Sequence, residues 1–449
     1  MTLWGGRFAG SMSDLTREFT GDSSDRRLLE VDVRGSIAHV TMLGQTGIID
    51  ETETAELVAG LHHILEEGED FEFYPTDEDV HTAVERRLEE LVGEVAGKLH
   101  TGRSRNDQIA LDLRLYLKRV GRTRVAELHQ LCSVLAEIAE DHAETVIPSY
   151  THLQQAQATT LGHHLLAYAW MALRDADRLT AAVHRMAHSP LGAGASSGSS
   201  LPLDRDMTAE ALEMDAVMAN SLDAVASRDF VSEYVFCCAQ TMIHLSRLAE
   251  ELILWSTKEF GWVTLGDEVS TGSSALPHKR NPDIAELIRG RTATVAGDVS
   301  AILALQKALP LAYNRDLQED KRIVFHADDT VAAAIEAMEA LLRGVEFSPP
   351  APGPETAALD LAESLVDRGV PFRQAHVAVG RLVRQVEDDG RSLEQATVAD
   401  LEAVDERFDP SDLGLLDPTT SVARRATWGS GSPQSVREQV AALRDILQD

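Results

Sequence analysis

The chain has 449 residues, of which 44% are hydrophobic and 25% charged, a composition typical of globular and not of disordered proteins. Lys and Arg number 41 and Asp and Glu number 73, which gives a formal net charge of −32. This charge excludes a nucleic-acid binder, which needs a basic face, and a protein that docks on anionic membranes. Only six of the 41 basic residues are lysine, and an acidic, lysine-poor composition is typical of salt-loving cells.

The cysteines and the apolar segments indicate the compartment. Cys132, Cys237 and Cys238 form no disulfide framework, and their apolar neighbours predict buried, inert thiols. The first ten residues lack the apolar core of a signal peptide, and no run of 18 apolar residues occurs. We therefore expect a cytoplasmic protein that does not span a membrane.

Long proline-free stretches predict long helices. The clearest apolar seam runs from Val231 to Leu252, with gaps that alternate between four and three residues. Asp229 stands at its start and Gly261 follows it, as expected for helix caps. Four further segments show helical character: 105–142, 152–188, 282–307 and 319–343. Because strand-like alternation is scarce, the sequence predicts an all-α fold built as a bundle of long helices.

Three segments interrupt the helical pattern. Gly and Ser are abundant in 189–203, and a second Gly/Pro-bounded loop covers 270–282. The segment 348–354 reads SPPAPGP and is typical of a linker. We expect three domains, with a helical N-terminal domain, a central long-helix domain and a helical C-terminal domain: 1–104, 105–356 and 357–449.

Four segments carry more polar and charged residues than a helix bundle needs: Leu99–Gln108, Tyr150–Gln157, Gly272–Pro282 and Pro310–Arg322. In the first, the guanidinium groups of Arg103 and Arg105 are suited to carboxylates, although a solvated turn before a helix explains them equally well. In the second, His152 is either structural or a proton donor to a leaving nitrogen. The cations of the four segments predict a small basic pocket on an acidic protein.

The third segment, GSSALPHKRNP, combines Ser273, Lys279 and Asn281 in one loop, which is suited to close over an anionic substrate. A plain flexible loop is the alternative. In the fourth, the spacing of Tyr313, Gln318 and Lys321 does not fit one helical face, so we expect a turn that leads into a helix. No HExxH, CxxC or nucleotide-binding glycine motif occurs, and the sequence gives no support for a metal site.

These segments together resemble the argininosuccinate lyase family of the fumarase/aspartase superfamily. The similarity covers nearly the whole chain and includes HTGRSRNDQ, YTHLQQAQ and YNRDLQEDK. Further matching segments are LWGGRF (Leu3–Phe8), DRRLLEVDVRGSIA (25–38), DEDVHTAVERRL (77–88), SRDFVSEY (227–234) and PFRQAH (371–376). The resemblance implies a homotetramer with a twenty-helix core and active sites built from three subunits. It also implies the reversible elimination of fumarate from argininosuccinate, which releases arginine in the last step of arginine biosynthesis, without a metal or organic cofactor.

The resemblance also implies roles for individual residues. Ser273 matches the proposed general base, His152 the proton donor and Glu286 the carboxylate that pairs with this histidine, while Lys279 assists the serine. Whether Ser273 or His152 is the base stays open. The positions that match substrate-binding residues, or that suit a carboxylate, are Asn106, Thr151, Tyr313, Gln318, Lys321, Arg105 and Asn281. His81 matches a motif position to which we assign no role.

This sequence departs from the family pattern at several points. The early binding serine of the family does not align cleanly, and in FTGDSSDRR the nearest substitute is Ser23, with Asp22 and Ser24 as alternatives. The loop reads ALPHKRNP, and its second half is similar to adenylosuccinate lyase. Adenylosuccinate lyase is therefore one alternative, and a second is an inactive structural homologue like the lens crystallins of this fold.

Overall fold

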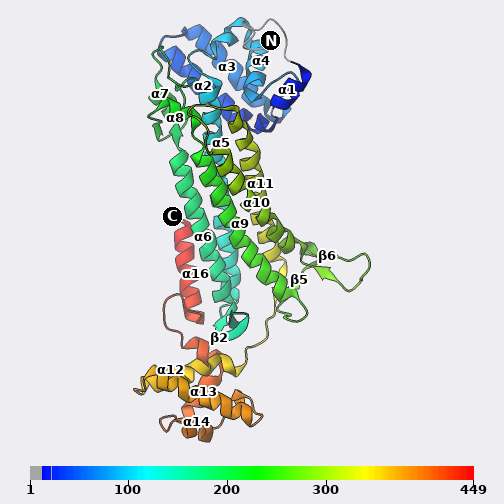
Figure 1. Ribbon diagram of the computed structural model, residues 1–449, viewed down its shortest axis with the longest axis vertical. Coiled ribbons are helices and arrows are strands. Elements are labelled where there is room, and N and C mark those ends of the chain that lie inside the picture. The colour runs from blue at the N-terminus through cyan, green and yellow to red at the C-terminus, as the bar shows by residue number, and fades with distance from the viewer. Residues whose placement is uncertain (1–12, 22, 449) are drawn as a thin grey trace. The chain divides into compact units, whose positions relative to one another are not determined.

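The computed structural model describes residues 13–21 and 23–448, and most of them are helical (Figure 1). The Leu3–Phe8 segment lies outside the described residues. The five longest helices are α5 (Arg105–Asp141), α6 (Leu161–Met186), α9 (Asp229–Ser256), α10 (Asp283–Gln306) and α11 (Asp320–Arg343). The expected all-α class and its long helices are confirmed. The seam on α9 is buried along its whole length, from Val231 to Leu252.

The chain divides into two compact units. The first unit comprises Met1–Val125, Asp177–Gln240 and Ala293–Val331, and the second comprises Ala126–Ala176, Thr241–Thr292 and Ala332–Asp449. The division passes through all five long helices, because each of them contributes residues to both units. The three domains expected from the sequence stay a prediction.

Three short helices of the first unit pack side by side: α2 (Leu29–Gln45), α3 (Glu51–Glu67) and α4 (Val80–Val92) (Figure 1). A capping box begins α3, where the Asp50 carboxylate accepts the Glu53 N–H at 2.9 Å. Leucines on the facing sides fill the core between these helices, and Leu57, Leu61 and Leu88 are fully buried. Their burial explains why such short helices are stable here.

The shorter elements of the first unit join the long helices. They are α1 (Asp14–Thr20), α7 (Arg205–Ala211), α8 (Ser221–Ala226) and the two-residue parallel strands β3 (His188–Ser189) and β4 (Ala216–Val217).

Two buried polar contacts connect the region around the start of α9 with α11. Arg228 Nε donates to Asp320 Oδ2 at 2.5 Å, and the Tyr234 hydroxyl donates to Asp328 Oδ1 at 2.6 Å.

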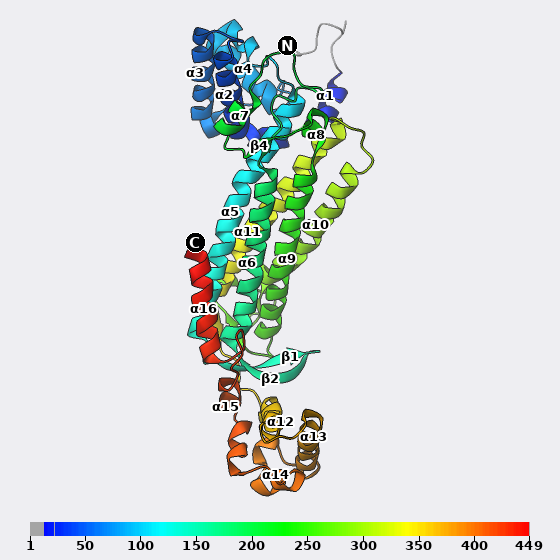
Figure 2. The ribbon, with the colours of Figure 1, turned by 90° about the vertical axis from the view of Figure 1, so that its left-hand side faces the viewer.

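In the second unit, β1 (Val146–Thr151) and β2 (Gln154–Thr160) form an antiparallel hairpin (Figure 2). The predicted helix over 152–188 is therefore wrong at its beginning, since the helix α6 starts only at Leu161. The reason is strand pairing: Thr159 and Thr160 lie opposite Ile147 and Val146, and β-branched residues of this kind favour strands. The hairpin places Thr151 and His152 at its tip.

The C-terminal part of the second unit is also helical, with α12 (Ala358–Asp367), α13 (Phe372–Asp388), α14 (Val398–Val404), α15 (Pro418–Ala423) and α16 (Pro433–Gln448). Helix α16 runs beside the end of α5 (Figure 2), where Arg444 Nη2 lies 2.6 Å from Glu140 Oε2. Residues 348–353 contain no helix or strand, as expected of a linker, and a short 3₁₀ helix (Pro354–Ala357) begins at the last residue of the predicted segment.

Two small antiparallel pairs complete the second unit: β5 (Val263–Leu265) with β8 (Val345–Phe347), and β6 (Thr271–Gly272) with β7 (Arg280–Asn281). The loop predicted at 270–282 is therefore closed at its base by β6 and β7. The cysteines Cys132, Cys237 and Cys238 are buried, as predicted. Among the described residues, no helix is long and apolar enough to cross a membrane.

Candidate functional site

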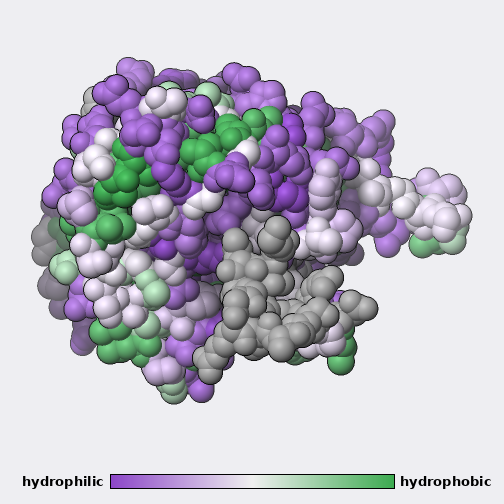
Figure 3. Space-filling model, turned by 90° about the horizontal axis from the view of Figure 1, so that it is seen from above, coloured by the Kyte–Doolittle hydropathy of each residue, from purple (hydrophilic) through white to green (hydrophobic). Residues whose placement is uncertain are grey.

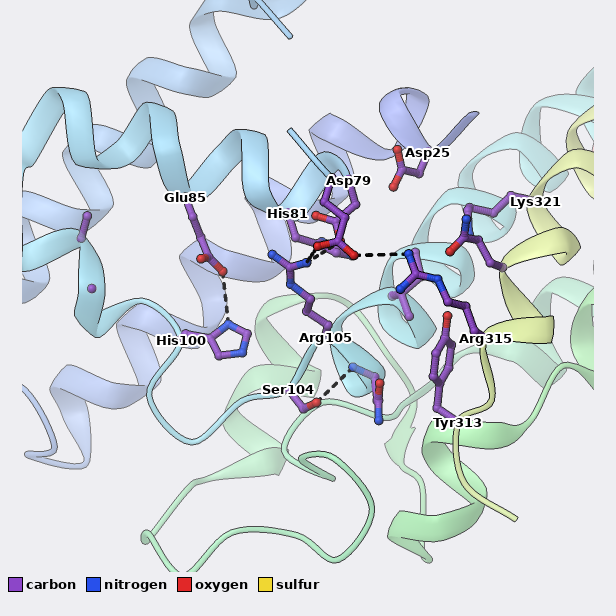
Figure 4. A pocket seen from close by; sticks show the side chains of 16 residues that line it. Asp25, Asp79, His81, Glu85, His100, Ser104, Arg105, Tyr313, Arg315 and Lys321 are labelled. Carbon is purple, nitrogen blue, oxygen red and sulfur yellow. Dashed lines mark hydrogen bonds and ion pairs between the residues drawn. The ribbon is translucent and has the colours of Figure 1, made fainter. Parts of the chain in front are cut away.

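A cavity of about 540 Å³ lies in the first unit (Figure 4). Its walls come from α4, from the beginning of α5 and from the segment that leads into α11. Five of the predicted binding residues line it: Arg105, Asn106, Tyr313, Gln318 and Lys321. Residues that are about 200 positions apart in the sequence are thus brought together around one space.

The beginning of α5 is held in place by a buried carboxylate, Asp107. Its Oδ1 accepts the Ser104 N–H at 2.9 Å, and its Oδ2 accepts the N–H groups of Gly192 and Gly194 at 3.0 and 2.8 Å. The Asn106 amide donates to the Ala195 carbonyl at 3.0 Å. The Gly/Ser-rich loop 189–203 is therefore fixed to the HTGRSRNDQ segment, which fixes the position of Arg105 and Asn106.

The two arginines of this segment point in different directions. Arg105 lines the cavity, where it donates to Asp79 Oδ2 at 2.7 Å and to Thr82 Oγ1 at 2.9 Å. Arg103 is buried and donates to Ser36 Oγ at 3.0 Å. Only Arg105 is therefore available at the cavity wall, and its guanidinium already holds a carboxylate of the protein.

The cavity is not the basic pocket expected from the sequence. Besides the cations Arg105, Arg315 and Lys321, it is lined by four carboxylates: Asp25, Glu78, Asp79 and Glu85. On the single chain, the cavity differs from this expectation because the start of α4 and the short helix η2 (Ser24–Leu28) bring acidic residues to the same wall. The lining is of mixed charge, with Arg315 Nη2 at 3.2 Å from Glu78 Oε1.

Tyr313 lies in an irregular segment, Gln318 in a short 3₁₀ helix (Arg315–Glu319) and Lys321 at the start of α11. The segment therefore leads into a helix, as the sequence predicts. Gln318 Nε2 donates to the Thr20 carbonyl at 3.1 Å. Lys321 Nζ lies 3.9 Å from Asp320 Oδ1, so that Asp320 stands between this lysine and Arg228. Burial raises the pKa of Tyr313.

Thr151 and His152 belong to the second unit, at the tip of the β1–β2 hairpin. His152 and Leu153 form the two-residue turn and have φ angles of 57° and 56°. Positive φ is uncommon for such residues, and two-residue hairpin turns usually place Asn and Gly there. Both Thr151 and His152 are exposed on the single chain.

Ser273 lies in the loop between β6 and β7, also in the second unit. Its Oγ accepts the N–H groups of Ala275 and Leu276 at 3.3 and 3.1 Å. Backbone donors directed at a hydroxyl oxygen stabilise negative charge on it. The Asn281 amide donates to Thr271 Oγ1 at 3.4 Å across the base of the loop.

The remaining predicted residues are on the surface. Lys279 and Glu286 are exposed, the first in the loop and the second near the start of α10. Ser23 is exposed and precedes η2, but it is not among the residues that line the cavity. The structure of the single chain therefore gathers five of the twelve predicted residues around one cavity and places six others on the second unit.

The sequence prediction missed several cavity residues, among them Asp25, Asp79, Glu85, His100 and Arg315. Glu85 and His100 form a pair, with His100 Nδ1 at 3.3 Å from Glu85 Oε1. Most of these residues belong to segments that the sequence had already singled out, such as DEDVHTAVERRL. The density of charged residues in that segment is the signal that could have identified them.

Family models match two regions of the chain. The family described as Lyase matches residues 6–297, and the family described as Argininosuccinate lyase C-terminal matches residues 355–423. Argininosuccinate lyases are similar over the full length of the chain. That of Carboxydothermus hydrogenoformans is 44% identical over 100% of both chains. That of Chloroflexus aurantiacus is 48% identical over 99% of this chain and 98% of the relative.

Solved structures show the same fold. EDDS lyase in complex with formate superposes with a TM-score of 0.83 and 28% identity, over 98% of this chain and 91% of the other. A variant of EDDS lyase with bound fumarate gives the same values. The class II fumarase of Schistosoma mansoni has a TM-score of 0.77 at 15% identity, over 94% and 97% of the two chains, and supports the fold alone. On the evidence of the full-length sequence similarity, this chain belongs to the argininosuccinate lyase family.

Proposed function

We propose that this protein catalyses the reversible elimination of fumarate from argininosuccinate, with arginine as the second product, in the arginine biosynthesis of the cytoplasm. The observation that carries the proposal is the mixed-charge cavity of the first unit. Argininosuccinate carries several carboxylates together with an amino group and a guanidinium group. The cavity offers partners for both kinds of charge: cations such as Lys321 for the carboxylates, and carboxylates such as Asp25 for the amino and guanidinium groups. The amide groups of Asn106 and Gln318 lie in the same cavity.

The reaction removes a proton from the carbon beside a carboxylate and breaks the bond between carbon and the guanidino nitrogen. Ser273 acts as the base in this proposal. A hydroxyl is a weak base, and the N–H groups of Ala275 and Leu276 stabilise the negative charge that makes it reactive. Lys279, in the same loop, supplies a positive charge next to the carboxylate on which the negative charge of the intermediate develops.

His152 delivers the proton to the departing nitrogen, and Glu286 orients and polarises its imidazole. The opposite assignment, with His152 as base, is a separate outcome that isotope exchange distinguishes. With argininosuccinate in deuterated water, the acidic hydrogen of the succinyl carbon should exchange in a His152→Asn variant and not in Ser273→Ala. Exchange in Ser273→Ala alone would reverse the two roles.

The proposal includes a homotetramer of three-domain subunits, with domains at 1–104, 105–356 and 357–449, and active sites shared between subunits. Its support is the exposure of the catalytic candidates. His152 and Glu286 are exposed on the single chain, whereas an elimination that passes through a charged intermediate needs a site that excludes water. A second subunit that covers the hairpin tip supplies this exclusion.

One assay tests the function. The absorbance of fumarate is followed after addition of argininosuccinate or, in parallel, adenylosuccinate, at low and at high KCl concentration. We expect fumarate from argininosuccinate alone. Fumarate from adenylosuccinate alone would assign the chain to the related lyase, and no fumarate from either substrate in a folded protein would identify an inactive homologue.

A further inference from the structure

At the cavity wall, three buried ionisable side chains from three helices meet. They are Asp32 on α2, His81 on α4 and Asp112 on α5, with exposed fractions of 1%, 3% and 0%. One ionisable atom of each side chain lies within 4.8 Å of the others. Of the three, only His81 also lines the cavity. The cluster is therefore connected to the candidate site through this histidine.

The two carboxylates of the cluster have different surroundings. Asp32 Oδ1 lies 2.8 Å from His81 Nδ1 and accepts a hydrogen bond from Gln108 Nε2 at 2.5 Å. Asp112 Oδ2 is 3.7 Å from the same histidine nitrogen, and among the described residues no N–H group donates a hydrogen bond to either of its oxygens. Hydrogen bonds that favour the ionised form are thus directed at Asp32 and not at Asp112.

Two ionised carboxylates do not coexist in so small a volume without water, and one of them retains a proton. Burial, followed by the charge of Asp32, raises the pKa of Asp112 well above its ordinary value. Burial by itself would raise the pKa of Asp32, but the charge of His81 and its hydrogen bond outweigh this effect and lower the pKa. Burial by itself would lower the pKa of His81, but the charge of Asp32 and its hydrogen bond raise it.

The remaining charged groups around His81 come from every element packed against it. Asp79 at the N-cap of α4 and Asp25 on η2 are acidic neighbours, while Arg105 at the start of α5 is a basic one. Arg103 is a second basic neighbour of the cluster, and its charge acts to lower the pKa of both Asp32 and Asp112. Arg105 and Arg315 already hold protein carboxylates, so a further charged donor beside Lys321 would strengthen the binding of an anionic substrate group in this cavity.

We propose that Asp32 is a positioning residue that holds His81 as an imidazolium whose second nitrogen donates to a carboxylate of the substrate, while Asp112 stays neutral. Because Nδ1 is bound to Asp32, Nε2 is the nitrogen left to face the cavity. His81 then contributes to binding as a charged donor with a fixed orientation. This inference rests on the proposed function and adds to it a substrate-binding cation that the sequence did not identify.

The experiment compares two substitutions of the same chemical size, Asp32→Asn and Asp112→Asn, in the full-length protein with argininosuccinate. Asn copies the neutral form that we assign to Asp112, so kcat/KM should change by less than about threefold in Asp112→Asn. Asp32→Asn removes the charge that holds the imidazolium. Its KM should rise about 10- to 100-fold, the effect of losing one charge-assisted hydrogen bond, with a smaller change in kcat.

The pH dependence separates positioning from a structural role. In Asp32→Asn the KM should fall as the pH is lowered, because His81 then regains its proton, whereas the KM of the wild type should show no such recovery. His81→Gln is the second variant, and keeps the test decisive if Asp32→Asn does not fold. Its KM should be raised to the same extent at every pH, because glutamine does not gain a charge.

Three results would overturn the inference. They are equal losses in Asp32→Asn and Asp112→Asn, a raised KM in Asp32→Asn that no change of pH restores, and a stoichiometric metal ion whose removal by EDTA raises the KM. An inactive wild-type protein would instead contradict the proposed function, so the two failures are distinguishable.

Discussion

At the scale of single residues, the cavity contains a group that opposes folding. Asp25 is buried, and this burial raises its pKa from 3.8 to about 6. A carboxyl whose pKa is higher in the folded state contributes stability at low pH, and this contribution is lost as the pH rises from about 4 to about 6. The ionised Asp25 at neutral pH is therefore a destabilising feature, as is common for residues kept for function.

Asp25→Asn should stabilise the protein at neutral pH. The interval between the two pKa values corresponds to an increase of up to about 3 kcal/mol in the free energy of unfolding at about pH 8. At about pH 4.5, where the carboxyl of the folded state is protonated, the variant and the wild type should differ little. Urea unfolding at both pH values measures this, with the exposed Asp70→Asn as the matched control. Equal or lower stability of Asp25→Asn at about pH 8 would contradict the argument.

The sequence could identify which segments carry the site, but not which side chains face the cavity. Arg103 and Arg105 are two residues apart, and one packs against Ser36 whereas the other faces Asp79. Gly102, with a φ of +72°, turns the chain just before them, and the direction of side chains after such a turn depends on tertiary packing. The roles of Asp32 and Asp112 were out of reach for the same reason, because only the packing of α2, α4 and α5 brings them together.

At the scale of elements, the long helices were predictable and the hairpin was not. The spacing of the apolar residues on α9, with no proline among them, predicts both that the segment is helical and which of its faces is buried. In β2, the run QQAQATT has no strict alternation, and its turn contains neither Asn nor Gly. Strand formation there depends on pairing with β1, a contact between neighbouring segments that periodicity does not report.

Leu153→Gly tests the strain in the hairpin turn. Leu153 has a φ of 56° and is 75% exposed, so its replacement removes an unfavourable backbone conformation with little loss of packing. Relief of the backbone strain stabilises the variant, and the greater flexibility of glycine in the unfolded chain offsets part of this gain. The net free energy of unfolding, measured with urea, should rise by about 0.5–1 kcal/mol. Leu201→Gly, at an exposed leucine without positive φ, should not be stabilised. A loss of stability in Leu153→Gly would show that the leucine side chain matters more than the turn.

At the scale of the whole molecule, the net charge of −32 governs how the protein surface interacts with solvent and salt, and it does not indicate the charge of the substrate. Hydrophilic residues cover most of the face seen in Figure 3, with smaller apolar patches between them. The cavity itself combines charges of both signs, so the net charge of the chain does not describe the site. Composition excluded whole classes of partners, but only three-dimensional packing revealed the charge of the cavity.

Salt should stabilise the protein if its acidity reflects a saline cytoplasm. At about 0.1 M salt the screening length is about 10 Å and at about 1 M it is about 3 Å, so repulsion between surface carboxylates falls steeply. We expect the melting temperature to rise by more than about 5 °C between about 0.1 and 2 M KCl. Sorbitol at equal osmolality is the control for general solvent effects. A flat response to KCl would contradict the proposed adaptation to salt.

Co-assembly tests whether active sites are shared between subunits. His152→Asn and Ser273→Ala should each be inactive, but a site that takes His152 from one subunit and Ser273 from another can be complete in a mixed tetramer. With random mixing at equal amounts, each of the two residues is intact with a probability of one half, so about a quarter of wild-type activity should return. The variants are mixed by dissociation and reassembly, each variant is treated alone as a control, and two different affinity tags verify mixed tetramers. Mixed tetramers without activity would place both residues in the same subunit.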